Sequence, residues 1–117
     1  MKVALRKDDE TSGLLRKTTE YCLYVKVELT DEETGAIKKA GIDDFRLMPY
    51  SYKGLENDWK VKSVVYASNK GSEHRFVAGN AIERNEMEQT VKEKLTALKS
   101  QITAQLSGGT GSETFEL

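Results

Sequence analysis

The sequence contains one cysteine, one histidine and one proline, and each scarcity excludes a class of structure. Cys22 alone cannot form an intrachain disulfide. Cys22 and His74 together cannot supply the four ligands of the usual structural zinc site. The single proline, Pro49, interrupts regular structure at only one place. We therefore expect a fold held together by packing, with no metal and no cofactor.

Long apolar runs are also missing. The longest uninterrupted one, residues 21–25, is far shorter than the roughly 20 residues that span a bilayer. Residues 1–6 lack the apolar core of a signal peptide. These absences predict a cytoplasmic protein that does not associate with membranes.

The charge balance gives the chain no strong field of either sign, since the formal net charge is -1. Binding to nucleic acid would therefore depend on a local patch. With 117 residues, 38% hydrophobic and 32% charged, the chain has the size and composition of one globular domain. We expect that α+β domain to occupy residues 1–106, followed by a flexible tail at 107–117 that contains glycine and serine.

Two strands are expected in the first part of the chain. We expect a strand at about residues 2–7, then a polar turn at 7–13. From residue 21 to residue 29 the odd positions are apolar, and the polar residues Glu20, Lys26 and Glu28 occupy even positions, the period of a strand with one buried face.

A short helix is expected next. Thr30 and Glu33 form the pattern of an N-terminal capping box, Lys38 and Lys39 suit the last turn, and Gly41 suits the left-handed cap.

The second half of the chain predicts three more strands, at residues 45–48, 59–68 and 73–78, the last two joined as a hairpin. Asn80 is then placed to cap a long helix over residues 81–106. The apolar stripe of that helix advances by three or four residues and contains Met87, Val91, Leu95, Leu98, Ile102 and Leu106.

The element order β-β-α-β-β-β-α predicts an α+β fold. We expect a mainly antiparallel sheet of about five strands, covered on one face by the short helix and the long C-terminal helix.

Three groups of residues were considered for chemistry. Cys22 and His74 are the residue types of an activated thiol, but Cys22 lies within a strand, where a lone cysteine usually packs. The acids Asp31, Glu32 and Glu33 suit a helix start, and Asp43 and Asp44 suit a turn. The glycines of residues 108–111 have no strand before them and no helix after them, as a phosphate loop requires. We therefore assign no catalytic residue and favour a protein that is not an enzyme.

The predicted hairpin of residues 59–78 carries the strongest local charge. Lys60, Lys62, Lys70 and Arg75 against the single acid Glu73 give four minus one, or +3. Trp59 and Tyr66 add stacking faces, a combination found in proteins that bind single-stranded nucleic acid on a sheet. Because Trp59 falls on the opposite side of the strand from Lys60 and Lys62, we prefer the interpretation that these lysines form a solvated face.

The sequence does not identify a function. Our leading hypothesis is a small non-enzymatic interaction module that binds another protein or a copy of itself. A helix over residues 81–106 is about 39 Å long and should overhang its sheet, yet the apolar stripe continues through Leu98, Ile102 and Leu106. These three residues are candidates for a homodimer contact, and the alternative is that the first helix or the N-terminal hairpin covers them within one chain. The alternatives are a nucleic-acid-binding domain that uses residues 59–75 and a small enzyme whose pocket periodicity does not reveal.

Overall fold

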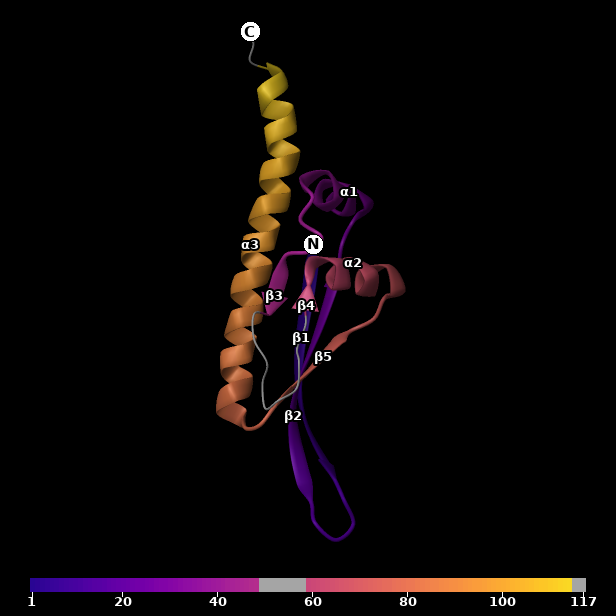
Figure 1. Ribbon diagram of the computed structural model, residues 1–117, viewed down its shortest axis with the longest axis vertical. Coiled ribbons are helices and arrows are strands. Elements are labelled where there is room, and N and C mark those ends of the chain that lie inside the picture. Colours follow the sequence, from indigo (N-terminus) through magenta and orange to yellow (C-terminus); the bar gives the residue numbers. More distant parts are fainter. Residues whose placement is uncertain (49–58, 115–117) are drawn as a thin grey trace.

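The computed structural model describes residues 1–48 and 59–114. It is elongated, with extents of 72 × 24 × 20 Å (Figure 1). The elements, in chain order, are β1 (Lys2–Ser12), β2 (Thr18–Glu28), α1 (Asp31–Ala40), β3 (Arg46–Met48), β4 (Trp59–Lys60), α2 (Val61–Lys70), β5 (His74–Ala78) and α3 (Ala81–Thr114).

The main sheet has three antiparallel strands in the order β1-β2-β5, and β3 and β4 form a second, two-stranded antiparallel sheet. The hairpin of β1 and β2 extends past the first turn of α3 at one end of the molecule, and α3 extends past the other elements at the opposite end (Figure 1). The α+β class, the antiparallel sheet and the long C-terminal helix predicted from the sequence are confirmed.

Strand β2 is the middle strand, and its odd-numbered side chains enter the core as the alternation predicts. Leu23, Val25 and Val27 are at most 4% exposed. The core is completed by apolar side chains from every helix and from β3, β4 and β5. Its other buried members are Ala36, Ile37, Ile42, Leu47, Met48, Trp59, Val61, Val64, Phe76, Ala78, Met87, Val91, Leu95, Leu98 and Ile102.

The caps of α1 and α3 form where the sequence places them. The Thr30 hydroxyl accepts a hydrogen bond from the Glu33 amide, the Glu33 carboxylate accepts one from the Thr30 amide, and Gly41 closes α1 in the left-handed conformation. At the start of α3, Asn80 Oδ1 accepts a bond of 2.8 Å from the Glu83 amide.

The strand predicted at residues 59–68 is wrong beyond Lys60. Residues 61–70 form helix α2, which buries Val61 and Val64 and ends at a left-handed Gly71. The two buried valines are three residues apart, a spacing that puts them on one helical face. β-branched residues favour strands in isolation, and here burial of that face overrides the local preference. The hairpin predicted over 59–78 is therefore a helix followed by strand β5.

The polar turn predicted at residues 7–13 is also wrong, because β1 continues to Ser12. The charged residues of this segment find distant partners that offset their poor strand preference. Lys7 Nζ lies 2.8 Å from Glu88 on α3, and the Arg84 side chain of α3 binds the Asp9 carboxylate. The actual loop, residues 13–17, is farther along the chain than the turn signals indicate.

Helix α3 is longer than the sequence predicts, since it continues past residue 106 to Thr114. The predicted flexible tail overlaps this last part of α3 and ends at residues 115–117, which lie outside the described residues. Pro49 also lies outside them. Within residues 1–48 and 59–114, no helix combines the length and hydrophobicity that a membrane crossing requires.

Gly13 holds the loop in a conformation that other residues rarely adopt. Its φ is +107°, and a Cβ at this position would lie 2.1 Å from the Arg16 carbonyl oxygen. We expect Gly13→Ala to lower the free energy of unfolding by at least about 1 kcal/mol, because the loop backbone must move. Urea unfolding followed by circular dichroism measures the change.

Gly35 provides the matched control. It lies within α1, and a Cβ there would meet nothing within 4 Å. Gly35→Ala should therefore raise the free energy of unfolding by about 0.5–1 kcal/mol. Equal effects of the two substitutions would contradict the strained loop.

Candidate functional site

The main sheet has two faces with different chemistry. The odd-numbered residues of β2 and their cross-strand partners lie on the core face. The even-numbered residues of β2 and their partners, which are odd-numbered in β5, lie on the outer face. These two faces determine which of the candidate residues can meet.

Cys22 and His74 are on opposite faces. Cys22 is paired with Val77 across the strands, whereas His74 is paired with Val25, a core residue. Burial raises the pKa of the Cys22 thiol, and burial lowers the pKa of His74. The His74 ring packs 4.3 Å from the ring of Phe76, between centroids. The structure therefore does not bring together the pair that an activated thiol requires.

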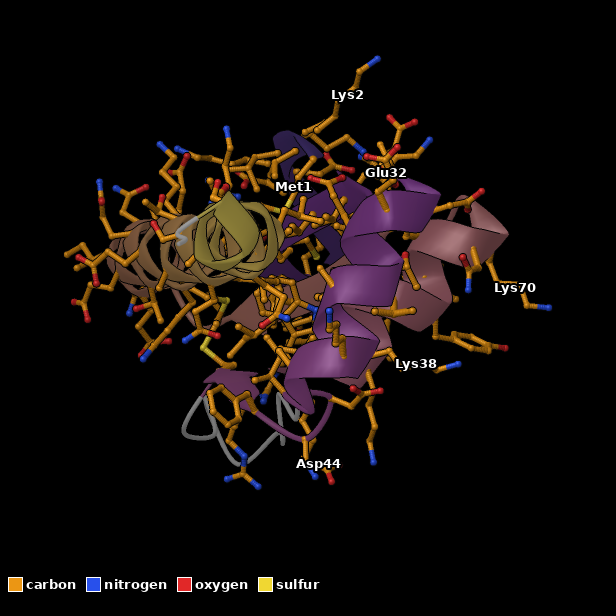
Figure 2. The ribbon with its side chains drawn as sticks, turned by 90° about the horizontal axis from the view of Figure 1, so that it is seen from above. Met1, Lys2, Glu32, Lys38, Asp44 and Lys70 are labelled. Carbon is orange, nitrogen blue, oxygen red and sulfur yellow. The ribbon has the colours of Figure 1, made fainter. Side chains whose placement is uncertain are left out.

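The acids considered for metal binding serve the ends of elements instead. Glu33 caps α1, and its carboxylate oxygen Oε2 lies 2.6 Å from the amino group of Met1. Met1 lies between α3 and α1 (Figure 2). Asp31 and Glu32 occupy the first turn of α1, and Asp44 faces Lys62 at 3.3 Å. Among the residues described, no cluster of three or more His, Cys, Asp or Glu side chains is placed to hold a metal ion.

The basic residues predicted as a nucleic-acid surface are divided between two parts of the fold. Lys60 ends β4, and Lys62 and Lys70 lie on α2, with Lys70 pointing outward from its end (Figure 2). Arg75 lies on the outer face of β5, where two carboxylates bind it. The four cations therefore do not form one patch.

Helix α2 presents a smaller feature of the same kind. Tyr66 is 66% exposed, Lys62 precedes it by one turn, and the Lys70 ammonium lies 5.6 Å from its ring centroid. Beside these residues is an open hollow of about 570 Å³ whose lining includes Glu73 and His74. Glu73 already binds Arg6.

The stripe residues proposed for a homodimer are mostly covered within one chain. Leu98 is 3% exposed and Ile102 is 2% exposed, whereas Leu106 is 43% exposed. Leu98 lines a small cleft that also contains Phe45, Leu47 and Val61. Leu98 and Ile102 are thus covered within one chain, one of the two possibilities that the sequence left open for the stripe.

The outer face of the sheet carries a hydrogen-bonded network that the sequence analysis missed. The Tyr24 hydroxyl donates to the Glu10 carboxylate and accepts a bond of 3.3 Å from Arg75. The same guanidinium donates to Glu10 at 3.1 Å and to Glu20 at 3.0 Å. The network joins β1, β2 and β5. Only strand register reveals it, because its members are far apart in the sequence.

A second pair extends this network along the strands. Arg6 donates two hydrogen bonds to the Glu73 carboxylate, at 3.1 and 3.2 Å. Its guanidinium also stacks over the Tyr24 ring, 3.8 Å from the centroid. Tyr24 is therefore held from both sides, which stiffens the hairpin where it leaves the body of the domain.

The hairpin tip, residues 13–17, exposes two adjacent leucines. Leu14 is 101% exposed and Leu15 is 104% exposed, so both side chains have their full area in water. Arg16 and Lys17 follow them and are also exposed. The tip therefore presents two exposed apolar side chains next to two cations, at the end of the projecting hairpin.

An apolar groove lies at the other end of β1. It is formed by Met1, Val3 and Leu5 on one side and by α3 on the other. Its volume is about 260 Å³, below the roughly 300–1,000 Å³ of typical small-molecule pockets, so it suits one or two side chains. The residues that α3 contributes are Val91, Lys92, Leu95, Thr96 and Lys99.

Comparison of the chain with protein-family models, with curated proteins and with solved structures finds no match. The function of the chain is therefore inferred from its own surfaces.

The network predicts the titration of Glu10. The hydrogen bond from Tyr24, and next that from Arg75, lower the pKa of this carboxyl below its usual value. A carboxyl with a lowered pKa contributes stability above its unfolded-state pKa, and that contribution is lost as the pH falls through the folded-state pKa. We expect Tyr24→Phe to raise the pKa of Glu10 toward its ordinary value.

Titration of the side-chain carboxyl signals by NMR measures this shift. Tyr66→Phe is the control, because Tyr66 lies on α2 and is not part of the network. An unchanged pKa of Glu10 in Tyr24→Phe would rule out the hydroxyl as the main cause.

Proposed function

We propose that the chain is a non-enzymatic protein-interaction module that binds its partner through the hairpin tip. One observation carries this proposal, the complete exposure of Leu14 and Leu15 at the end of a projecting hairpin. A single exposed leucine is ordinary on a protein surface, but two adjacent leucines at full exposure form an apolar surface that a partner can contact.

The energetic argument follows from the exposed area. Fully burying a leucine side chain gives about 1.5–3 kcal/mol, so two leucines supply a substantial part of the free energy of a moderate complex. Arg16 and Lys17 keep the tip in water until a partner covers it.

Rigidity supports the same proposal. Gly13 has a φ of +107° and lies close to the Arg16 carbonyl. Tyr24 is held between Arg6 and Glu10 along the hairpin. A tip that is already ordered loses less conformational entropy on binding. We place this activity in the cytoplasm, as the sequence analysis expects.

A photoreactive amino acid at position 15 of the full chain tests the proposal in the cell that produces it. We expect one discrete cross-linked product, because a tip buried in a partner places the photoreactive group against it. The product should disappear when Leu14→Ser is added, and excess unlabelled wild-type protein should compete it away.

The matched control is the same photoreactive group at position 82. Ile82 is 71% exposed but lies in the first turn of α3, away from the tip. Equal cross-linking from the two positions, or none from position 15, would refute the proposal.

Nucleic-acid binding is the second candidate, and the arrangement of Lys62, Tyr66 and Lys70 on α2 favours it. If α2 binds single strands by stacking, an oligonucleotide should bind with an affinity that falls steeply with salt, and Tyr66→Ala should weaken it by about tenfold. Fluorescence anisotropy measures both effects. No binding at low salt would eliminate this candidate.

A further inference from the structure

We propose that the partner of the hairpin tip is a second copy of this chain. In this arrangement two copies pair antiparallel along the free edges of β1, about a two-fold axis through Asp8. The tip of each copy then reaches the apolar groove of the other. This inference rests on the proposed function, because it names the occupant of the same tip.

Strand β1 offers a free edge. Among the described strands only β2 pairs with it, and β1 is the outermost strand of its sheet. It has 11 residues, and its register with β2 is continuous from Lys2 to Ser12. Edge strands of monomeric proteins are usually short, bulged or interrupted by proline, because a long regular edge pairs with another chain. The charges of β1 are the one protective device that it carries.

Those charges are segregated by sign. Lys2, Arg6 and Lys7 occupy the first part of the strand, and Asp8, Asp9 and Glu10 follow them. A parallel copy would place like charges opposite one another. An antiparallel copy brings the cations of one strand near the acids of the other, in addition to the intrachain ion pairs that these side chains already make, so the same pattern opposes one pairing and favours the other.

The register follows from matching the faces of the two sheets. A two-fold axis perpendicular to a continuous sheet pairs residues of the same face, so the two opposed residue numbers must add to an even sum. With Asp8 opposite Asp8, Lys7 lies opposite Asp9 and Arg6 opposite Glu10, each pair occurring twice. If the axis passed through Lys7, the contact of Arg6 with Asp8 would be the only type of opposite-charge pair left. If it passed through Asp9, the two acids Asp8 and Glu10 would face each other.

The same register brings the two exposed apolar surfaces together. With Asp8 on the axis, Ser12 of the second copy, the last residue of its β1, lies opposite Ala4, so the tip that follows it extends toward Met1 and Val3. Met1 and Val3 line the apolar groove, and Val3 is 43% exposed within one chain. The axis is therefore chosen by charge alone, and the apolar match follows without a further assumption.

The cations of the tip do not oppose this contact. Lys92 and Lys99 line the groove, but Lys92 already binds Glu88 on α3 at 3.4 Å. In the second copy, β1 lies next to the groove and β2 lies one strand farther away. Arg16 and Lys17 directly precede β2, so their backbone lies on the side of the tip farther from the groove.

Helix α3 packs mainly on β2, β3 and β5, and it reaches β1 through the ion pairs of Glu88 with Lys7 and of Arg84 with Asp9. Both contacts are to odd-numbered residues of β1, whose side chains lie on the core face of the sheet rather than along its free edge. Specific interfaces usually bury about 1,200–2,000 Å² in total, more than two strand edges alone supply, so the contacts of the tips are needed for a stable dimer.

Disulfide trapping tests the register. Directly opposed residues of an antiparallel pair have Cα atoms about 4.5–5.5 Å apart, within the range of a disulfide. We expect Asp8→Cys to form a covalent dimer on mild oxidation of the full chain. Lys2→Cys is the matched control, because Lys2 lies on the same face of the same strand, is exposed and points away from the body of the protein (Figure 2). Wild type controls for Cys22, which is buried.

Sedimentation equilibrium of the reduced proteins tests the energetics. Leu14→Ser with Leu15→Ser should weaken the dimer by at least about tenfold while circular dichroism stays unchanged, because both side chains are fully exposed in one chain. Asp8→Asn should strengthen it by about two- to fivefold, because it removes the like-charged pair on the axis. Asp43→Asn makes the same change of net charge at an exposed position elsewhere and should have no effect.

Three results would overturn the inference. The first is a wild type that is monomeric at every concentration, and the second is Lys2→Cys cross-linking as readily as Asp8→Cys. The third is a dimer dissociation constant that the two leucine substitutions leave unchanged. A monomeric wild type that still cross-links from position 15 to a different protein would reject the second copy and leave the proposed function standing. A dimer trapped by Asp8→Cys without a product from position 15 would reject tip binding and, with it, the arrangement proposed here.

Discussion

The alternation of side chains along β2 is the constraint on which the rest of the structure depends. Its odd residues, such as Leu23 and Val25, bind the sheet to the core, and its even residues, such as Tyr24, join the charged network of the outer face. A shift of one residue would exchange the two sets and place Tyr24 and Glu20 in the core. One strand therefore positions the helices on one side and stiffens the projecting hairpin on the other.

The features that the sequence predicted correctly are those decided by neighbouring residues. The alternation of β2, the capping box of Thr30 and Glu33, and the stripe of α3 each depend on residues within a few positions. The errors arise where distant partners decide. Residues 61–70 are rich in valine and favour a strand locally, but burial of Val61 and Val64 stabilises a helix. The acidic part of β1 lacks strand preference and is held by Arg84 and Arg75.

The candidate surfaces were beyond sequence analysis for a related reason. Leu14 and Leu15 look like ordinary apolar residues in the sequence, and only the position of the loop at residues 13–17 leaves them without cover. From the sequence, Leu98 and Ile102 could be covered either by a second chain or within one chain, and the structure buries both, with Leu98 lining a cleft that also contains Phe45, Leu47 and Val61. Exposure is a property of the assembled fold: the two leucines of the loop are fully exposed, whereas Leu98 and Ile102 of the helix are buried within one chain.

The pairing of β2 with two strands also sets an order of assembly. Strands β1 and β2 are joined by a short loop, and hairpins of this kind form in about 1–10 μs. The pairing of β2 with β5 must first close the long segment that contains α1 and α2, which carries a larger entropic cost. The hairpin is then present early, with its free edge in solution before α3 has packed against the sheet. The segregation of charge by sign along β1 would in that interval disfavour parallel, fibril-like stacking of nascent chains, a protection needed before the native fold exists.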